Sequence, residues 1–183
     1  MELLKLERIS LYSTIKKKLA CFSYNDIENG VMLYCLSQYG RDAKGYKNEV
    51  AYEIFDILCL SNLPTEIETI TEFFEVLLEE ENKYENGIVF TPRFIAEYIV
   101  KEAFAKVSAS ISDARIIDPG CGCGIFLVAA AEFILRNSTK QIDAIIENNI
   151  FGIDIIPDNV RRCKLIMKLL SAKYGGNYET ITP

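Results

Sequence analysis

The stretch "RIIDPGCGCGIFLVAAAEFIL" (Arg115–Leu135) constrains the fold more than any other part of this chain. It joins a short, almost wholly apolar run to a longer apolar run through a turn that holds three glycines. The short run is typical of a buried parallel strand, and the longer run predicts a buried helix over residues 125–136. A second strand is predicted in "IFGIDI" and a second helix in "PDNVRRCKLIMKLLSAKYGG", with Pro157 in its first turn and Gly175 at its end. This order predicts a parallel sheet with right-handed crossovers.

Two further segments belong to the same half of the chain. "GIVFTPRFIAEYIVKEAFAKV" predicts an extended start and then a helix in which Ile95, Ile99 and Ala103 share one apolar side. "NSTKQIDAIIENN" is expected to be a polar loop that holds a short helical turn. A doubly wound sheet has about five or more strands, whereas this sequence supplies two and stops at "ETITP". We therefore expect an α/β fold that is the first half of a Rossmann-like domain, cut short.

The first part of the chain has helical periodicity instead. Helices are predicted over 3–22, 25–40, 48–60 and 65–81, and the second of them is expected to be capped by Asn25/Asp26 and ended by Gly40. The sequence thus predicts an N-terminal helical domain over residues 1–86 and an α/β domain over residues 87–183.

The composition excludes several classes of function. Because there is no histidine, the chain lacks Ser-His and Cys-His nucleophile pairs and every metal site that needs imidazole. Lys and Arg number 20 against 26 Asp and Glu, and a net charge of −6 does not favour a surface for nucleic-acid phosphates. The N-terminal "MELLKLERIS" has no signal-peptide core, and no apolar stretch is long enough to span a bilayer. We therefore expect a soluble cytoplasmic protein whose six cysteines are reduced thiols.

The glycine-rich turn lies where an open α/β sheet binds its ligand, at the carboxyl ends of the strands. Asp118 ends the first predicted strand and Asp154 the second. Gly120, Gly122 and Gly124 let the backbone approach a ligand, and the following helix presents its N-terminal amides to a negative group. A plain tight turn would leave both carboxylates unexplained, so ligand binding is the favoured interpretation.

The spacing of these residues distinguishes between ligands. A dinucleotide site has the pattern G-x-G-x-x-G with an acidic residue about 20 positions further on, whereas here the pattern is G-C-G-C-G and Asp154 lies 30 residues after Gly124. Asp118, which precedes the glycines, would repel a pyrophosphate but could bind an amino group. A ligand with an ammonium end and a ribose end fits better, and S-adenosylmethionine has both.

Cys121 and Cys123 raise the alternative of a zinc site. A structural zinc ion needs four ligands, usually as two spaced pairs. The remaining cysteines form no second pair, at positions 21, 35, 59 and 163. We therefore expect no metal in the turn.

Three segments resemble the motifs of one family, the N6-adenine DNA methyltransferases of restriction–modification systems. "DPGCGCGIFL" is very close to their cofactor motif D-P-A-C-G-S-G-x-F-L, and "GIVFTPRFIAEYIV" resembles the G-x-x-Y-T-P segment that precedes it. "FGIDIIPDNVRRCKLIMKLL" resembles their second cofactor motif, so the resemblance covers about residues 84–172. The N-terminal helices resemble the small helical domain of type I modification subunits and of related fused restriction–methylation enzymes.

The resemblance implies S-adenosylmethionine as cofactor and assigns roles to matching positions. Thr91 would contact the methionine carboxylate, Asp154 would bind the ribose hydroxyls, and Ile155 would pack on the adenine ring. The methionine end would be held by a carboxylate and the backbone that follows it: Asp118, Pro119, Gly120, Cys121 and Gly122. The sequence departs from the motif in having Gly120 in place of Ala and Cys123 in place of Ser.

A larger departure concerns catalysis. The family holds its target adenine with [DN]-P-P-[YF], but this sequence has no two adjacent prolines and hence no catalytic residue to assign. We expect the motif to lie beyond Pro183 in a longer parent, so that this chain alone is inactive. DNA would be bound through the parent, a specificity subunit is a candidate partner, and an open sheet edge would favour self-association. Two alternatives stay open: methylation of another substrate, such as protein glutamine, and a non-catalytic module that docks a specificity subunit.

Overall fold

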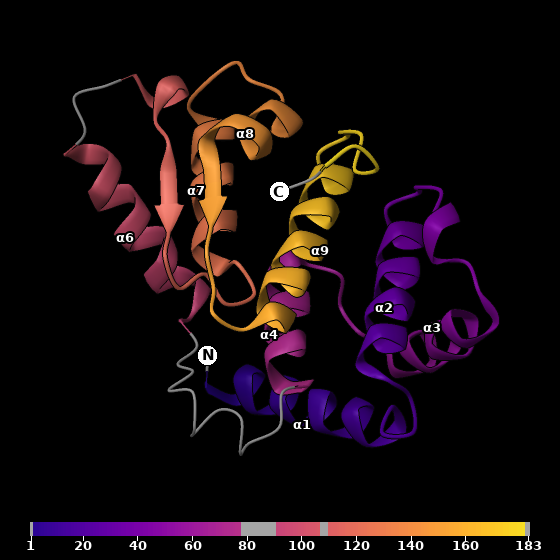
Figure 1. The fold of residues 1–183 in the computed structure, drawn as a ribbon. Helices are drawn as coiled ribbons and strands as arrows, with labels where there is room; N and C mark the ends of the chain where they lie inside the picture. Colours follow the sequence, from indigo (N-terminus) through magenta and orange to yellow (C-terminus); the bar gives the residue numbers. More distant parts are fainter. Residues whose placement is uncertain (1, 78–90, 107–109, 182–183) are drawn as a thin grey trace. The chain divides into compact units, whose positions relative to one another are not determined.

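The computed structural model describes residues 2–77, 91–106 and 110–181. The chain divides into two compact units, Met1–Glu79 and Glu80–Pro183, each of which is described by itself (Figure 1). The boundary predicted between residues 86 and 87 lies outside the described residues.

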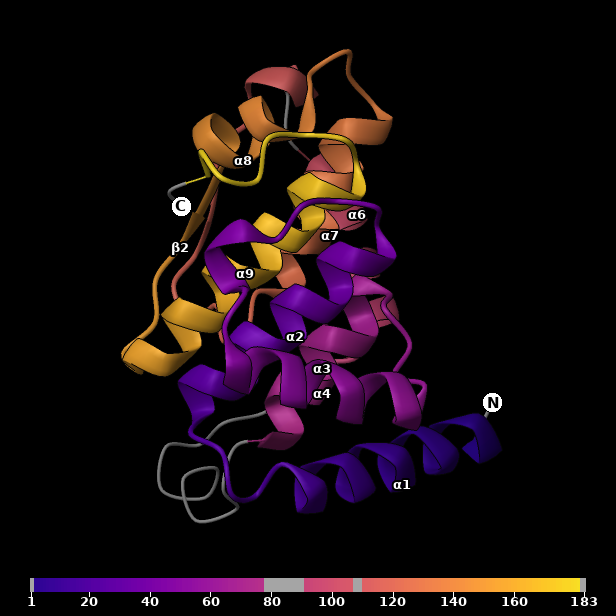
Figure 2. The same cartoon turned by 90° about the vertical axis from the view of Figure 1, so that its right-hand side faces the viewer.

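The first unit is a set of packed helices: α1 (Glu2–Lys18), α2 (Tyr24–Gln38), the short 3-10 helix η1 (Lys44–Tyr46), α3 (Glu49–Ser61) and α4 (Ile67–Leu77). α2 packs along α3, and α1 contacts both α3 and α4 (Figure 2). The ring centroids of Tyr12 on α1 and Phe73 on α4 are 5.9 Å apart, and both side chains are buried. A Cβ at Gly30 of α2 would lie 2.4 Å from Cγ2 of Ile54, so α2 and α3 approach closely at this glycine.

The helix ends of this unit agree in part with the sequence. Gly40 follows α2 with φ 67°, as predicted for the residue that ends this helix. The predicted cap at Asn25/Asp26 is wrong, because both residues lie inside α2 and Oγ of Ser23 accepts the main-chain N–H of Asp26 at 3.1 Å. Ser23 has an extended backbone before the first turn, which is the conformation that an N-cap residue needs.

The second unit contains a two-stranded parallel sheet of β1 (Ile116–Asp118) and β2 (Ile150–Gly152). Ile117 pairs with Phe151, which confirms the parallel strand pair predicted from the sequence. The main-chain pairing continues past the strand ends, because the N–H of Ile153 donates to the carbonyl oxygen of Asp118 at 2.9 Å. The ends of both strands therefore lie side by side.

The unit also contains these helices: α6 (Arg93–Ala105), η2 (Ile111–Asp113), α7 (Ile125–Arg136), α8 (Ile142–Asn149) and α9 (Pro157–Lys173). α7 contacts both strands as well as α6, α8 and α9, and it runs alongside the two strands in Figure 1. Its bounds are those predicted from the long apolar run. The rings of Phe104 on α6 and Phe133 on α7 stack with centroids 4.6 Å apart. α7 is thus the centre of this unit's core.

The structure adds detail to two predictions for this unit. The segment predicted as a polar loop contains α8, whose Ile142, Ile145 and Ile146 are buried. On α6 the packed side carries Ala96, Val100 and Phe104.

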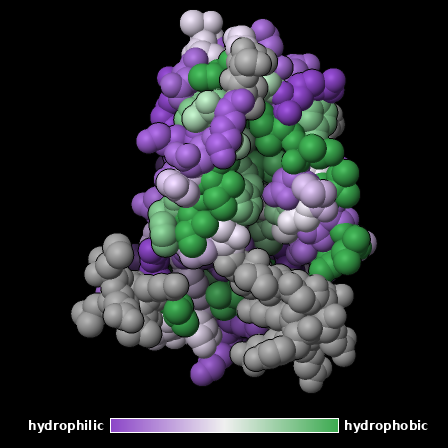
Figure 3. Space-filling model, turned by 90° about the vertical axis from the view of Figure 1, so that its left-hand side faces the viewer, coloured by the Kyte–Doolittle hydropathy of each residue, from purple (hydrophilic) through white to green (hydrophobic). Residues whose placement is uncertain are grey.

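The side of α6 that was predicted to be apolar faces solvent, with Ile95 and Ile99 37% and 45% exposed. Figure 3, in which the left-hand side of Figure 1 faces the viewer, shows apolar patches on this face among hydrophilic side chains. Within the described residues, no helix is both long and apolar enough to cross a membrane.

Candidate functional site

The glycine-rich loop joins β1 to α7 and passes beside the end of β2. The N–H of Cys121 donates to the carbonyl oxygen of Ile153 at 2.9 Å, and the N–H of Gly124 donates to the carbonyl oxygen of Cys121 at 2.8 Å. Gly122 and Gly124 have φ of 53° and 96°, which L side chains rarely adopt. A Cβ at Gly124 would also lie 2.8 Å from Sγ of Cys163. The turn at these two positions therefore requires glycine.

The loop leaves its backbone accessible on one side. A Cβ at Gly120 or at Gly122 would meet no heavy atom within 4 Å. Gly124 is the N-cap of α7, and no side chain caps this helix. A ligand can therefore approach the main chain of the loop at Gly120 and Gly122.

Asp118 lies at the end of β1 with one carboxylate oxygen paired and the other not. Oδ1 accepts the main-chain N–H of Gly120 at 3.1 Å. Oδ2 is buried and has no hydrogen-bond partner among the residues that the structure describes. A buried carboxylate oxygen without a donor is costly, so this atom is suited to a donor that a ligand brings, such as an ammonium group.

Asp154 follows β2 and is held from two sides. Its Oδ2 accepts the N–H of Gly122 at 2.9 Å, and its Oδ1 accepts the N–H of Ile156 at 2.8 Å. Nδ2 of Asn159, in the first turn of α9, lies 3.3 Å from the same Oδ1. The carboxylate therefore joins the glycine-rich loop to the start of α9. Asn159 was not singled out from the sequence, and only its place five residues after Asp154 hints at this contact.

The remaining residues of the predicted site are placed as follows. Pro119 and Gly120 are exposed at the turn, and the side chain of Ile155, next to Asp154, is 86% exposed. Thr91 is half-buried and makes no hydrogen bond to the glycine-rich loop within the described residues. The N-cap of α6 is Pro92, so Thr91 lies one residue before the cap. The structure thus brings together the two carboxylates and the loop, and Thr91 precedes a helix that packs on α7.

The cysteines of the loop are buried thiols. Cys121 and Cys123 are 5% and 3% exposed, and Cys163 of α9 lies beside the loop. A hydrogen bond to Cys121 and burial raise the pKa of Cys163, so this thiol stays protonated. Among the described residues, no group of three or more His, Cys, Asp or Glu side chains is arranged to hold a metal ion.

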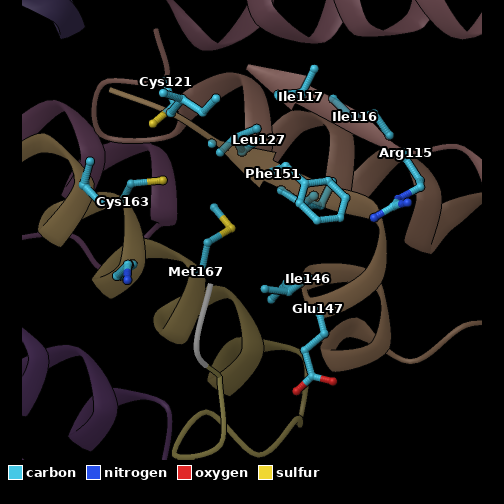
Figure 4. A pocket seen from close by; sticks show the side chains of 15 residues that line it. Arg115, Ile116, Ile117, Cys121, Leu127, Ile146, Glu147, Phe151, Cys163 and Met167 are labelled. Atoms are coloured by element: carbon cyan, nitrogen blue, oxygen red, sulfur yellow. The ribbon is translucent and has the colours of Figure 1, made fainter. Parts of the chain in front are cut away.

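A cavity of about 870 Å³ lies against β1 and β2, with α8 and α9 on its other sides (Figure 4). Phe151, Ile146 and Met167 point into it, and Cys121 and Cys163 lie at one end. Neither Asp118 nor Asp154 lines the cavity. It therefore adjoins the glycine-rich loop without containing the carboxylates of the candidate site.

Comparison with known proteins identifies a family. The model of the family described as N-6 DNA methylase matches residues 65–179. No curated protein and no solved structure matches the chain. Because the match covers more than half of its 183 residues, the chain belongs to the N-6 DNA methylase family, a family of methyltransferases.

Proposed function

We propose that these residues form the cofactor-binding part of an adenine-N6 DNA methyltransferase from a restriction–modification system. The observation that carries the proposal is the pair of carboxylates, Asp118 and Asp154, at the ends of two parallel strands with the glycine-rich loop between them. The family match supports methyl transfer to DNA. The parallel strands and α7 support a Rossmann-like sheet as the framework.

S-adenosylmethionine is the proposed cofactor, and it would supply the methyl group. The unpartnered Oδ2 of Asp118 fits the ammonium end of this molecule, and the open backbone at Gly120 and Gly122 fits its methionine part. Asp154 would bind the ribose, and the exposed side chain of Ile155 offers an apolar surface for the adenine ring. Thr91 is proposed as a contact of the methionine carboxylate. These residues bind and orient the cofactor but offer nothing to hold the adenine that is methylated.

The target base would be held by a [DN]-P-P-[YF] motif from a region or subunit outside these residues. The absence of adjacent prolines and the net charge of −6 support this division of roles. DNA and a specificity subunit are the proposed partners of the whole enzyme in the cytoplasm. The second edge of β2, which pairs with no described strand, is the proposed site of self-association.

A methyl-transfer assay tests this function. The protein of 183 residues and a longer version that includes a [DN]-P-P-[YF] motif are each incubated with tritiated S-adenosylmethionine and mixed-sequence DNA. We expect label in DNA with the longer protein and none with the shorter one. Label from the shorter protein would contradict the division of roles. Label in a protein substrate but not in DNA would contradict DNA as the substrate.

A further inference from the structure

Asp154 makes more hydrogen bonds to its own chain than the role of a ribose ligand requires. A carboxylate offers about four acceptor positions. Three of them are occupied. Oδ1 accepts the N–H of Ile156 and Nδ2 of Asn159, and Oδ2 accepts the N–H of Gly122. One acceptor position is left, so only one of the two ribose hydroxyls can donate to Asp154 without displacing a donor of the protein.

We infer that Asp154 is a positioning residue that holds the glycine-rich loop in its ligand-binding shape before any ligand arrives. The inference rests on the proposed function for the identity of the ligand. The three hydrogen bonds themselves are made within the chain.

The loop needs such a contact because little else fixes its middle. Glycine loses more conformational freedom on ordering than any other residue, and Gly120 and Gly122 have no atoms around their missing Cβ positions that would restrain them. The main-chain bonds of Cys121 and Gly124 fix the turn before and after Gly122, and Sγ of Cys121 lies 3.7 Å from the carbonyl oxygen of Gly122. The bond to Asp154 is the hydrogen bond that orients the N–H of Gly122.

Asp154 is itself held firmly enough to serve this purpose. The bond from the N–H of Ile156 closes a local turn at the start of α9. Asn159 is 3% exposed and supports the same oxygen from the first turn of the helix. The side chain of Asp154 thus links the loop to the start of α9. Its hydrogen bonds are charge-assisted, and such bonds are stronger than neutral ones.

The positioning role and the ligand role predict different behaviour. If Asp154 only binds ribose, its loss leaves hydrogen exchange in the loop unchanged when no ligand is present. It then lowers the affinity only for ligands that have ribose hydroxyls. If Asp154 positions the loop, its loss speeds hydrogen exchange at the N–H of Gly122 when no ligand is present. It also lowers the affinity for a ligand that lacks those hydroxyls.

Amide hydrogen exchange in the ligand-free protein, followed by NMR, tests the inference. In Asp154→Ala we expect the N–H of Gly122 to exchange at least about tenfold faster than in the unsubstituted protein, because a bond to a charged group is lost. Asn149→Leu is the matched control. This buried asparagine of the same unit donates to the carbonyl oxygens of Ser112 and Ala114, at 3.0 and 2.6 Å, and does not contact the loop. Unchanged exchange in Asp154→Ala, or equal acceleration in the control, would overturn the inference.

A second variant and a ligand pair complete the test. Asp154→Asn keeps the size of the side chain and loses the charge, so it decides the matter if Asp154→Ala does not fold, and a smaller acceleration at Gly122 is expected. S-adenosylhomocysteine and its 2′,3′-dideoxy analogue are then titrated, and we expect the Asp154 substitution to lower the affinity for both compounds. Weakening of S-adenosylhomocysteine alone would overturn the positioning role. Failure of the unsubstituted protein to bind either compound would count against the proposed function and leave the exchange result standing.

Discussion

Arg93, the first residue of α6, forms an ion pair with Glu132 of α7, and their side chains are only 11% and 9% exposed. Glu132 also accepts the hydroxyl of Tyr174 at 2.8 Å and lies 3.9 Å from Nζ of Lys173, both at the end of α9. One carboxylate therefore connects α6, α7 and α9 in the second unit. Charges this well buried are stable only while they are paired.

Removal of this carboxylate is expected to destabilise the second unit. Glu132→Ala leaves Arg93 buried with Glu97, at 2.9 Å, as its other carboxylate partner. We expect the free energy of unfolding to fall by about 3 kcal/mol, measured by urea denaturation. Glu102→Ala, at an exposed position of α6, is the control and should change stability little. Equal effects of the two substitutions would show that the ion pair contributes nothing.

The same residue predicts a dependence of stability on pH. Burial alone would raise the pKa of Glu132, but Arg93, the Tyr174 hydroxyl and Lys173 together lower it below the usual value. A carboxylate whose folded pKa is lowered stabilises the fold above its unfolded pKa of about 4.3 and loses this contribution as the pH falls through the folded pKa. We expect the acid loss of unfolding free energy, measured from about pH 7 to about pH 3, to be smaller in Glu132→Gln than in the unsubstituted protein. An identical pH profile would contradict this assignment.

A side chain at Gly124 is expected to be costly for two reasons. Its φ of 96° disfavours L residues, and a Cβ would lie 2.8 Å from Sγ of Cys163. Gly175 has φ 81° and open space around its Cβ position, so Gly175→Ala measures the cost of the backbone alone. We expect Gly124→Ala to lower the thermal unfolding midpoint more than Gly175→Ala, by a difference of about 1–3 kcal/mol in unfolding free energy. Equal shifts would mean that Cys163 moves aside freely.

The cysteines around the loop are predicted to be structural thiols. A structural zinc ion needs four ligands, whereas the described residues hold no group of three or more His, Cys, Asp or Glu side chains arranged for a metal ion. Elemental analysis of protein purified without added metal should find no stoichiometric zinc. One equivalent of zinc that disappears in the double variant Cys121→Ser, Cys123→Ser would contradict this prediction.

The elements that the sequence predicts best are those fixed by local chemistry. Pro157 and Gly175 delimit α9 as expected, and the largely apolar run over residues 125–136 gives the bounds of α7. Ser23 was missed as a cap because a polar residue also follows two positions later, and only the backbone conformation decides between them. Local patterns therefore locate helices well and their caps less well.

Packing between distant segments was less predictable. α6 has apolar residues on both sides, and periodicity does not tell whether Ile95 and Ile99 or Val100 and Phe104 face α7. The role of Glu132 depends on Arg93, 39 positions before it. Partners of this kind become visible only when the fold is known.

The candidate site shows the same division. The positions of Asp118 and Asp154 at adjacent strand ends follow from the strand pattern, because parallel strands end at one edge of the sheet. Their hydrogen bonds do not follow, since they depend on the φ angles of the glycine-rich loop and on Asn159. The sequence thus predicts which carboxylates meet but not what each of them binds.

Titration calorimetry with S-adenosylmethionine tests the central claim, that Asp118, Asp154 and the loop between them bind this cofactor. The protein, Asp118→Ala and Asp154→Ala are titrated under the same conditions, with Glu102→Ala as the control. We predict weak, saturable binding of one cofactor, reduced at least about tenfold by either aspartate substitution because charge-assisted hydrogen bonds are lost, and unchanged in the control. Absence of saturable binding, or equal affinity in all four proteins, would contradict the claim.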